Sequence, residues 1–313
     1  MLSIIVPCYN AERTLRETIE SAFAQYVTKE IIVVDDGSTD GTRDIIRSFG
    51  DSIRPLFGPN KGAGAARNNG TRLARGDFLQ YLDSDDLLAP GTLRARLDAL
   101  QSSGADVAHT DWQKLIEQTD GSYRPGAVMR PPLELIEEDA EAATATSRFW
   151  APPAALLYRR TIVELVGEWR EDLRIIQDAR FLFDAATCGA RFVHISGVGA
   201  FYRTGSMSLS RRNPANFVAD CLCNIAEIDR LWHLQKSPTK SRIDALYGMW
   251  RQMAIASLMG GLDGFDQARA GHNRMGSRHY LIELGFLLRA CLGKRLTAGL
   301  LQRALWVRSW MRQ

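Results

Sequence analysis

Three acidic residues follow an apolar segment near residue 80, and their spacing suits the binding of a metal ion. The segment "DFLQYL" (77–82) has the character of a buried strand, and Asp83, Asp85 and Asp86 come directly after it. Side chains alternate along an extended segment, so Asp83 and Asp85 point to the same side. Such a pair can hold Mg²⁺ or Mn²⁺, hard cations that keep free positions for phosphate oxygens. The alternative interpretation is that Asp85 or Asp86 caps the helix near Pro90.

Polar residues also follow two earlier apolar segments. The first segment, "LSIIVPCY", ends with Pro7 and Tyr9 and is followed by Asn10. The second, "EIIVVDD", ends with Asp36, and Ser38 comes two residues later. In an open α/β sheet, ligands bind beyond the carboxyl ends of the strands. We therefore expect the polar groups to line one shared site, where Asp36 could accept a hydrogen bond from a base or a ribose.

A loop of small residues adds two cations. The stretch "NKGAGAARNNG" (60–70) places Lys61 and Arg67 at the start of a helix, a position that favours phosphate. It matches neither a P-loop nor G-x-G-x-x-G, so it does not by itself indicate those nucleotide-binding classes. In the preceding "DDGSTDGT", Thr39 or Asp40 could cap the next helix.

The first hundred residues alternate between apolar strands and amphipathic helices. The apolar runs are continuous, which is typical of strands in a parallel sheet covered on both faces. Their alternation with helices predicts an α/β fold with a doubly wound, mostly parallel sheet of Rossmann-like type and right-handed crossovers. We expect strands at 2–9, 30–36, 53–58 and 77–82, and helices at 11–25 after an Asn10 cap, 37–50, 61–74 and 90–104.

Beyond residue 104 the pattern loosens. It indicates a sheet of mixed direction, a variable region between its first two strands, and a helical end of the chain. The expected strands are 105–117, 154–160, 191–195 and 198–203, with a helix at 175–189. Residues 216–313 indicate three or four helices, with turns near Ser237-Pro238, Gly260-Gly261 and Gly293.

Composition and charge narrow the class of protein. The chain has 313 residues and a net charge of +3, too small to argue for nucleic acid. Residues 1–212 carry 25 Lys and Arg against 29 Asp and Glu, whereas residues 213–313 carry 14 against 7. The five cysteines have no zinc-type spacing, and neither a signal peptide nor a spanning helix is indicated. We therefore expect a cytoplasmic protein with reduced thiols.

Four segments together resemble a known enzyme family. "SIIVPCYN", "EIIVVDDGSTDGT", "NKGAGAARNNG" and "GDFLQYLDSDD" occur in order over about 80 residues, and they resemble the family-2 inverting glycosyltransferases of the GT-A fold. The likeness is firm to about residue 100 and fainter to about 210. It implies a GT-A domain at 1–212, with a nucleotide-binding half at 1–104 and an acceptor half at 105–212, followed by a helical region at 213–313.

The resemblance implies roles for the residues at the strand ends. Pro7, Tyr9, Asn10 and Asp36 would hold the nucleotide base and ribose, with Ser38, Lys61 and Arg67 beside them. Asp85 would bind a divalent metal, Mn²⁺ or Mg²⁺, that grips the diphosphate, and Asp83 would contact the metal or the ribose.

The catalytic base of this family is a carboxylate in a Glu-Asp pair that opens a later helix. Here Gln177-Asp178 stands in its place, so Asp178 is the expected base, with Asp172 as a rival that better suits a turn. The resemblance makes Arg203 a candidate diphosphate contact. Thr204 stands where the family often has histidine, which puts a metal-ligand role there in doubt.

The last twenty residues, "KRLTAGLLQRALWVRSWMRQ", combine basic and apolar side chains. A basic helix that bears Trp suits a membrane interface and would bring the enzyme to a lipid-linked acceptor. The alternative is a terminal helix that packs on its own domain. We expect the protein to be cytoplasmic and, if this helix binds membrane, peripheral on the inner face of the cell membrane.

These patterns lead to one expected function and two alternatives. We expect a metal-dependent inverting glycosyltransferase that moves a sugar from a nucleotide-diphosphate donor, by default UDP-linked, to a hydroxyl of a glycan or lipid-linked acceptor, as in surface polysaccharide synthesis. A nucleotidyltransferase would usually show a glycine-rich basic loop after the first strand, and "PCYNAERTL" is neither. A catalytically weakened glycan-binding homologue is the second alternative, suggested by Gln177 and Thr204.

Overall fold

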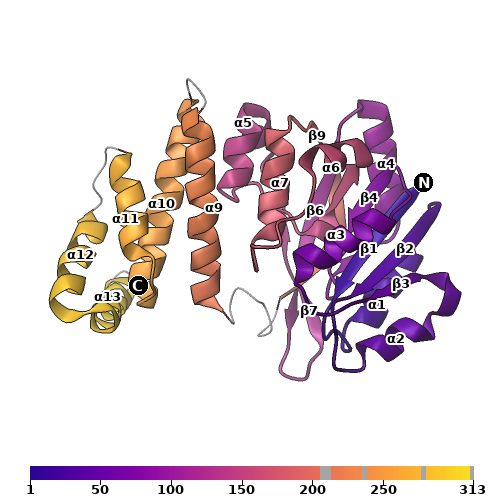
Figure 1. The fold of residues 1–313 in the computed structure, drawn as a ribbon, viewed down its shortest axis with the longest axis horizontal. Coiled ribbons are helices and arrows are strands. Elements are labelled where there is room, and N and C mark those ends of the chain that lie inside the picture. Colours follow the sequence, from indigo (N-terminus) through magenta and orange to yellow (C-terminus); the bar gives the residue numbers. More distant parts are fainter. Residues whose placement is uncertain (205–212, 235–237, 276–279, 311–313) are drawn as a thin grey trace. The chain divides into compact units, whose positions relative to one another are not determined.

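The chain forms two units, Met1–Ser208 and Leu209–Gln313 (Figure 1). The computed structural model describes residues 1–204, 213–234, 238–275 and 280–310. The first unit is built on a β-sheet and the second on helices.

One mixed sheet runs through the described part of the first unit. Its strands are β1 (Leu2–Cys8), β2 (Lys29–Asp35), β3 (Arg54–Phe57), β4 (Phe78–Tyr81), β5 (Leu87–Leu88), β6 (Val107–Glu117), β7 (Tyr123–Met129), β8 (Leu156–Arg159) and β9 (Phe192–Thr204). Their order is β3-β2-β1-β4-β8-β6-β9-β5, with β7 paired to β6. The first four strands are parallel, whereas β8 runs antiparallel to both of its neighbours.

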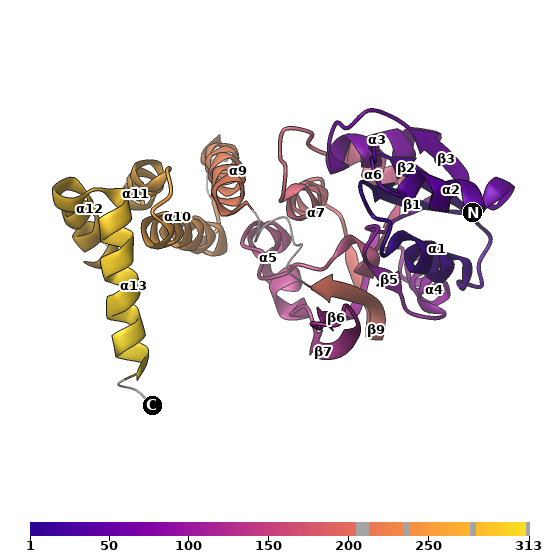
Figure 2. The same cartoon turned by 90° about the horizontal axis from the view of Figure 1, so that it is seen from below.

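Helices cover both faces of this sheet. They are α1 (Leu15–Phe23), α2 (Thr42–Ser48), α3 (Ala63–Leu73), α4 (Thr92–Ser103), α5 (Leu133–Ala145), α6 (Arg160–Val166) and α7 (Gln177–Thr187). Helices α1 and α4 lie on one face, and α3 and α6 on the other (Figure 2). The apolar stripe of α1 explains its packing, because Leu15, Ile19 and Ala22 recur at helical spacing and are fully buried. The predicted doubly wound α/β arrangement is confirmed.

The order of the strands creates a switch point at β1. From β1 the chain winds outward to β2 and β3, then returns to place β4 on the other side of β1. The register pairs Cys8 with Asp35 and Ile5 with Tyr81, so the carboxyl ends of β2 and β4 flank the end of β1. Ligands of open α/β sheets bind at such a switch point.

Several expected boundaries were wrong for local reasons. Helix α1 begins at Leu15 and its N-cap is Thr14, because Asn10 adopts a left-handed backbone conformation (φ 49°) and its side chain binds another loop. The segments 191–195 and 198–203 form the single strand β9, whose pairing with β6 shifts register near Asp111. The variable region contains β7 and α5, which the sequence did not indicate.

The second unit consists of helices in its described part. They are α9 (Pro214–Leu234), α10 (Lys240–Gly260), α11 (Phe265–Arg274), α12 (Tyr280–Leu292) and α13 (Lys294–Trp310). The expected turns occur at Gly261 and Gly293, both with positive φ, whereas Ser237 lies outside the described residues. The described part holds five helices instead of the expected three or four, because α11 ends at Arg274 and α12 begins at Tyr280.

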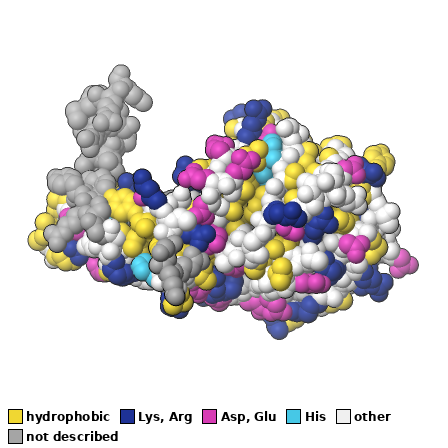
Figure 3. Space-filling view, turned by 90° about the horizontal axis from the view of Figure 1, so that it is seen from above, with side chains coloured by type: hydrophobic (Ala, Val, Ile, Leu, Met, Phe, Trp, Pro, Cys, Tyr) yellow, Lys and Arg dark blue, Asp and Glu magenta, His cyan; other side chains and the backbone are white. Residues whose placement is uncertain are grey.

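Two properties bear on binding to membranes and to charged partners: the hydropathy of the helices and the distribution of surface charge. None of the helices within the described ranges has both the length and the apolar character that a membrane span requires. On the face drawn in Figure 3, basic and acidic side chains are interspersed, so neither sign of charge dominates that face.

Helix α3 depends on close contact through its glycines, and Gly64 provides a test. A Cβ at Gly64 would lie 2.7 Å from the backbone oxygen of Arg170, and neither backbone can give way cheaply. We expect Gly64→Ala to destabilise the first unit by roughly 1–3 kcal/mol, as overpacking usually does. Gly248→Ala is the control, since a Cβ there meets nothing within 4 Å. Thermal unfolding of both variants checks this, and equal stability of the two would contradict it.

Candidate active site

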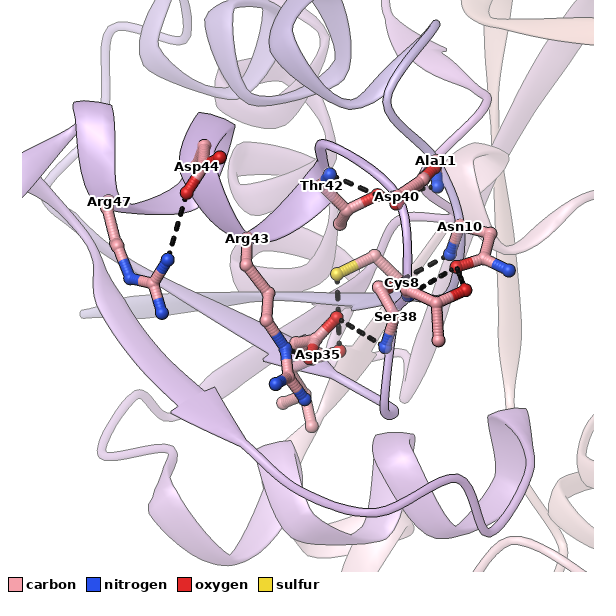
Figure 4. A network of polar contacts seen from close by, with 12 residues as sticks. Cys8, Asn10, Ala11, Asp35, Ser38, Asp40, Thr42, Arg43, Asp44 and Arg47 are labelled. Atoms are coloured by element: carbon pink, nitrogen blue, oxygen red, sulfur yellow. Dashed lines mark hydrogen bonds and ion pairs between the residues drawn. The ribbon is translucent and has the colours of Figure 1, made fainter.

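The ends of β1 and β2 are joined by side-chain hydrogen bonds (Figure 4). The backbone N–H of Asn10 donates to Ser38 Oγ at 2.9 Å, and Asn10 Oδ1 accepts from the backbone N–H of Thr39 at 2.8 Å. Tyr9, between this contact and β1, is 50% exposed and so is accessible to a ligand. Pro7 is buried in the strand itself. The structure therefore brings these predicted nucleotide contacts together at one edge of the sheet.

The two aspartates that end β2 have different tasks. Asp35 is fully buried and pairs with Arg43 at 2.7 Å, which anchors the start of α2 (Figure 4). Asp36 accepts the backbone N–H groups of Lys61 and Gly62, both at 2.8 Å. Burial raises the pKa of Asp36, although these two hydrogen bonds act in the opposite direction. Asp36 thus fixes the loop before α3, and each of its two carboxylate oxygens already accepts one hydrogen bond from that loop.

The acidic group after β4 is held by two buried arginines. Arg67 Nη2 donates to Asp83 Oδ1 at 2.5 Å, and the backbone N–H of Arg203 donates to Asp86 Oδ1 at 3.0 Å. Asp86 is fully buried, and its Oδ2 has no partner among the described residues. Asp85 retains an exposed surface. Although the residue as a whole is exposed, protein atoms crowd its carboxyl, and this desolvation, followed by the negative charge of Asp83, raises the pKa of Asp85 to about 6. The group therefore carries negative charge that these arginines only partly offset.

These aspartates do not cap the next helix. Helix α4 begins at Thr92 and its N-cap is Gly91. The first-turn N–H of Leu93 donates to Gln25 Oε1 at 3.2 Å, and neither Asp85 nor Asp86 accepts a hydrogen bond from this turn. The capping alternative for Asp85 and Asp86 is wrong. At α2 the N-cap is Gly41, so the expected Thr39 or Asp40 cap is also wrong, although Asp40 accepts the backbone N–H of Thr42 at 3.0 Å.

The carboxylates of Asp83 and Asp85 fit a divalent cation by their chemistry. Carboxylate oxygens are the ligands that Mg²⁺ and Mn²⁺ prefer. Within the described ranges, no third acidic, histidine or cysteine side chain converges on this pair. Sites of this kind usually hold Mg²⁺ through one or two carboxylates and complete its coordination with substrate phosphates.

Arg67 also connects this edge of the sheet to α7. Its guanidinium lies 4.6 Å from the ring centre of Trp169, and Trp169 stacks on Phe181 of α7 at 4.1 Å with an angle of 3° between the planes. Asn68 exchanges two hydrogen bonds with the backbone of Trp169, at 3.0 and 2.8 Å. The loop before α7 is therefore fixed to α3.

Asp178 lies in the first turn of α7, where the helix dipole favours a negative charge. Its Oδ2 accepts a hydrogen bond from Trp150 Nε1 at 3.0 Å. Burial raises the pKa of Asp178, while Arg67, the backbone N–H of Ala179 and the Trp150 contact favour the ionised form. The neighbouring Gln177 is buried, and its Oε1 has no partner among the described residues.

The remaining candidates occupy different environments. Arg203 is buried and binds the backbone oxygen of Asp85 at 3.0 Å, pairs with Glu17, and lies over Tyr123. Asp172 is exposed and pairs with Arg170 at 2.6 Å, which lowers the pKa of its carboxyl.

Two further predicted positions are peripheral to these contacts. Thr204 Oγ1 donates to the backbone oxygen of Leu115 at 3.2 Å. The side chain of Lys61 is exposed, and only its backbone N–H is engaged with Asp36.

Sequence reasoning missed two aromatic residues at the site, Trp169 and Tyr202. Trp150 lies in the variable region, where we expect acceptor contacts, but its link to Asp178 was not predicted. Trp150 contacts Asp178, and Tyr202 lies near enough to Asp86 and Asp178 for their charges to raise the pKa of its hydroxyl, after burial. No spacing in the sequence links these residues, because each comes from a separate segment.

The family model for glycosyl transferase family 2 matches residues 3–167, just over half of the chain. The chain therefore belongs to this family of glycosyltransferases. Among its relatives is the succinoglycan biosynthesis protein ExoO of Rhizobium meliloti, 32% identical over 219 residues that span 67% of this chain and 62% of ExoO. Across four bacterial relatives, the aligned region is 52% to 77% of the relative's own length.

Two solved structures share the fold at low sequence identity. TarS of S. aureus (residues 1–349), in complex with UDP-GlcNAc, aligns with a TM-score of 0.59 and 20% identity, covering 88% of each chain. The mannosyltransferase PcManGT of Pyrobaculum calidifontis, in complex with GDP-Man and Mn²⁺, aligns with a TM-score of 0.58 and 18% identity, covering 99% of this chain and 82% of that one. The GT-A fold predicted from the sequence is confirmed.

The raised pKa of Asp85 leads to a prediction about stability. Its folded-state pKa, about 6, lies above the ordinary value of 3.8, so the folded protein takes up a proton as the pH falls and gains stability from it. At pH 7.5 in EDTA, Asp85→Asn should therefore raise Tm, and the difference from wild type should shrink as the pH approaches 4. Asp44→Asn, at an exposed carboxylate of α2, is the control. A lower Tm for Asp85→Asn would contradict the prediction.

Proposed function

We propose that the chain is a metal-dependent inverting glycosyltransferase that transfers a sugar from a UDP-linked donor to a hydroxyl of a glycan or lipid-linked acceptor. The observation that carries the proposal is the acidic group at the switch point, where Asp83 pairs with Arg67 and the charges of both act on the nearby Asp178. In this proposal residues 1–212 form the catalytic domain, with a nucleotide-binding half at 1–104 and an acceptor half at 105–212. Residues 213–313 form a helical extension.

The nucleotide would bind across the ends of β1 and β2. Tyr9 and Asn10 would contact the base, and Asp36 and Ser38 would contact the base or ribose. Asp36 would do so while it holds the loop before α3. The TarS complex with UDP-GlcNAc supports a UDP-linked donor, although the same fold holds GDP-Man in the PcManGT complex.

The phosphates would lie between the loop before α3 and the acidic group. Lys61, Arg67 and Arg203 supply positive charge there, and Asp83 and Asp85 would hold Mn²⁺ or Mg²⁺. A cation bound in this way acts as a Lewis acid that neutralises charge on the departing diphosphate. The presence of Mn²⁺ in the PcManGT complex and the oxygen ligands of Asp83 and Asp85 support this assignment.

Asp178 would act as the general base. The acceptor hydroxyl attacks C1 of the sugar, its proton passes to the carboxylate of Asp178, and the bond from C1 to the diphosphate oxygen breaks with its electron pair leaving on the nucleotide. Attack opposite the leaving group inverts the configuration at C1. A raised pKa makes a carboxylate a better base near neutral pH, while the first turn of α7 keeps Asp178 ionised.

The acceptor is proposed from relatives and from the composition of the C-terminal helices. ExoO is a succinoglycan biosynthesis protein, which favours a growing surface polysaccharide as the acceptor. The basic balance of residues 213–313 favours contact with an anionic lipid surface, as a peripheral protein on the cytoplasmic side. Membership of the family favours this reaction over nucleotidyl transfer, and the intact acidic group favours it over glycan binding alone.

Thermal shift with UDP, GDP and dTDP, each with and without Mn²⁺, tests the donor site. A nucleotide at one hundred times its Kd should stabilise the protein by about 2.7 kcal/mol. We expect a Mn²⁺-dependent shift with one nucleotide, lost in Asp85→Asn and kept in Asp178→Asn. Asp178→Asn should also lower turnover of the matching sugar donor by roughly 10²–10⁴-fold, because it removes the base. A full Mn²⁺-dependent shift in Asp85→Asn would remove the metal from the proposal.

Liposome flotation tests the membrane surface. With vesicles that contain anionic lipid, the intact chain should float and a chain that ends at residue 292 should not, because the truncation removes the four basic residues of α13 and Arg312 after it. Neutral vesicles are the control for charge. Equal flotation of the two chains would contradict the role of this segment.

A further inference from the structure

The carboxylate of Asp178 is in contact with an aromatic cluster formed by Trp112, Trp150 and Tyr202. Each pair of these rings meets nearly edge to face, with ring centres 5.3 to 5.6 Å apart. Such pairs stabilise a fixed geometry beyond the effect of burial alone. The indole of Trp150 is thus held from two sides while its Nε1 donates to Asp178 Oδ2 at 3.0 Å.

The three residues reach this place from separate elements. Trp112 lies in β6, Tyr202 in β9, and Trp150 between α5 and β8. The two strands are neighbours in the sheet, so Trp112 and Tyr202 stand on a rigid support. Trp150 is partly buried, and it is the member of the cluster that carries the contact to α7.

We propose that Trp150 is the positioning residue of the reaction: its indole N–H fixes the orientation of the Asp178 carboxylate and stabilises its ionised form. This inference rests on the proposed role of Asp178 as the base. It assigns Trp150 a task beyond the acceptor contact expected of the variable region in which it lies.

The physical effect of the Trp150 contact follows from the charges around Asp178. Arg67 favours the ionised carboxylate, and Asp83 disfavours it. Tyr158 and Tyr202 also face Asp178, and its negative charge in turn disfavours ionisation of their hydroxyls. A neutral donor such as the indole N–H favours the ionised carboxylate without adding charge. Trp150 therefore limits the rise in the pKa of Asp178 that burial causes, while holding the oxygen in place.

A matched pair of substitutions isolates the hydrogen bond. Trp150→Phe and Trp112→Phe make the same chemical change in the same cluster, and both keep an aromatic ring. Only the first removes a donor to Asp178, because Trp112 Nε1 is buried without a partner among the described residues. Packing alone would make the two variants behave alike.

The first measurement does not depend on turnover. Carboxyl ¹³C NMR titration of ¹³C-Asp-labelled full chain, with Asp178 assigned through Asp178→Asn, reports its pKa directly. Trp150→Phe should raise the proton affinity of Asp178 by about tenfold, and Trp112→Phe should leave it unchanged. Equal titration of Asp178 in wild type and Trp150→Phe overturns the proposal.

The second measurement is the pH profile of UDP release from UDP-GlcNAc with Mn²⁺. In Trp150→Phe we expect kcat to fall on the order of tenfold with KM for the donor unchanged, and the acidic limb to move to higher pH. Trp112→Phe should keep the wild-type profile, and matching profiles for the two variants overturn the proposal. If Asp178→Asn keeps wild-type turnover, the base assignment fails instead, and the ¹³C titration still decides whether Trp150 controls the carboxylate.

Discussion

The concentration of negative charge at the end of β4 is the constraint on which the rest of the site depends. Burial raises the pKa of Asp85 and Asp86, and the negative charge of neighbouring aspartates, Asp83 among them, raises it further. The protein offsets this with two buried arginines: the Arg67 guanidinium pairs with Asp83, and Arg203 gives its backbone N–H to Asp86 and its positive charge to the group. A buried charge is tolerated only when it is paired and hydrogen-bonded. Arg67 and Arg203 therefore tie α3 and β9 to the acidic group.

The parts that the sequence predicted correctly are those set by local pattern. Continuous apolar runs place β1, β2 and β4, and the polar residues after them meet because parallel strands end at the same edge. The glycines of α3 allow its close approach to β1, where a Cβ at Gly70 would lie 2.4 Å from Ile5. In these segments the local preference and the tertiary fold agree.

The parts of the fold and site that the sequence did not predict depend on contacts between distant segments. Asn10 is a good capping residue by type, yet its side chain is used 29 positions away at Thr39. Asp36 lies at the strand tip as expected, but its oxygens are bound to the loop before α3. The contact between Trp150 and Asp178 joins residues 28 positions apart, and no periodicity marks it. Tertiary interactions of this kind override local propensity.

The stack of Arg67, Trp169 and Phe181 limits how the family could vary at these positions. The Trp169 ring contacts both the Arg67 guanidinium and the Phe181 ring, so a smaller side chain at 169 would expose Arg67 and Phe181 at once. Effects of substitutions in such a chain of contacts are not additive. Over evolutionary time the three positions should change as a set, with a compensating replacement at 67 or 181 accompanying any loss of the indole at 169.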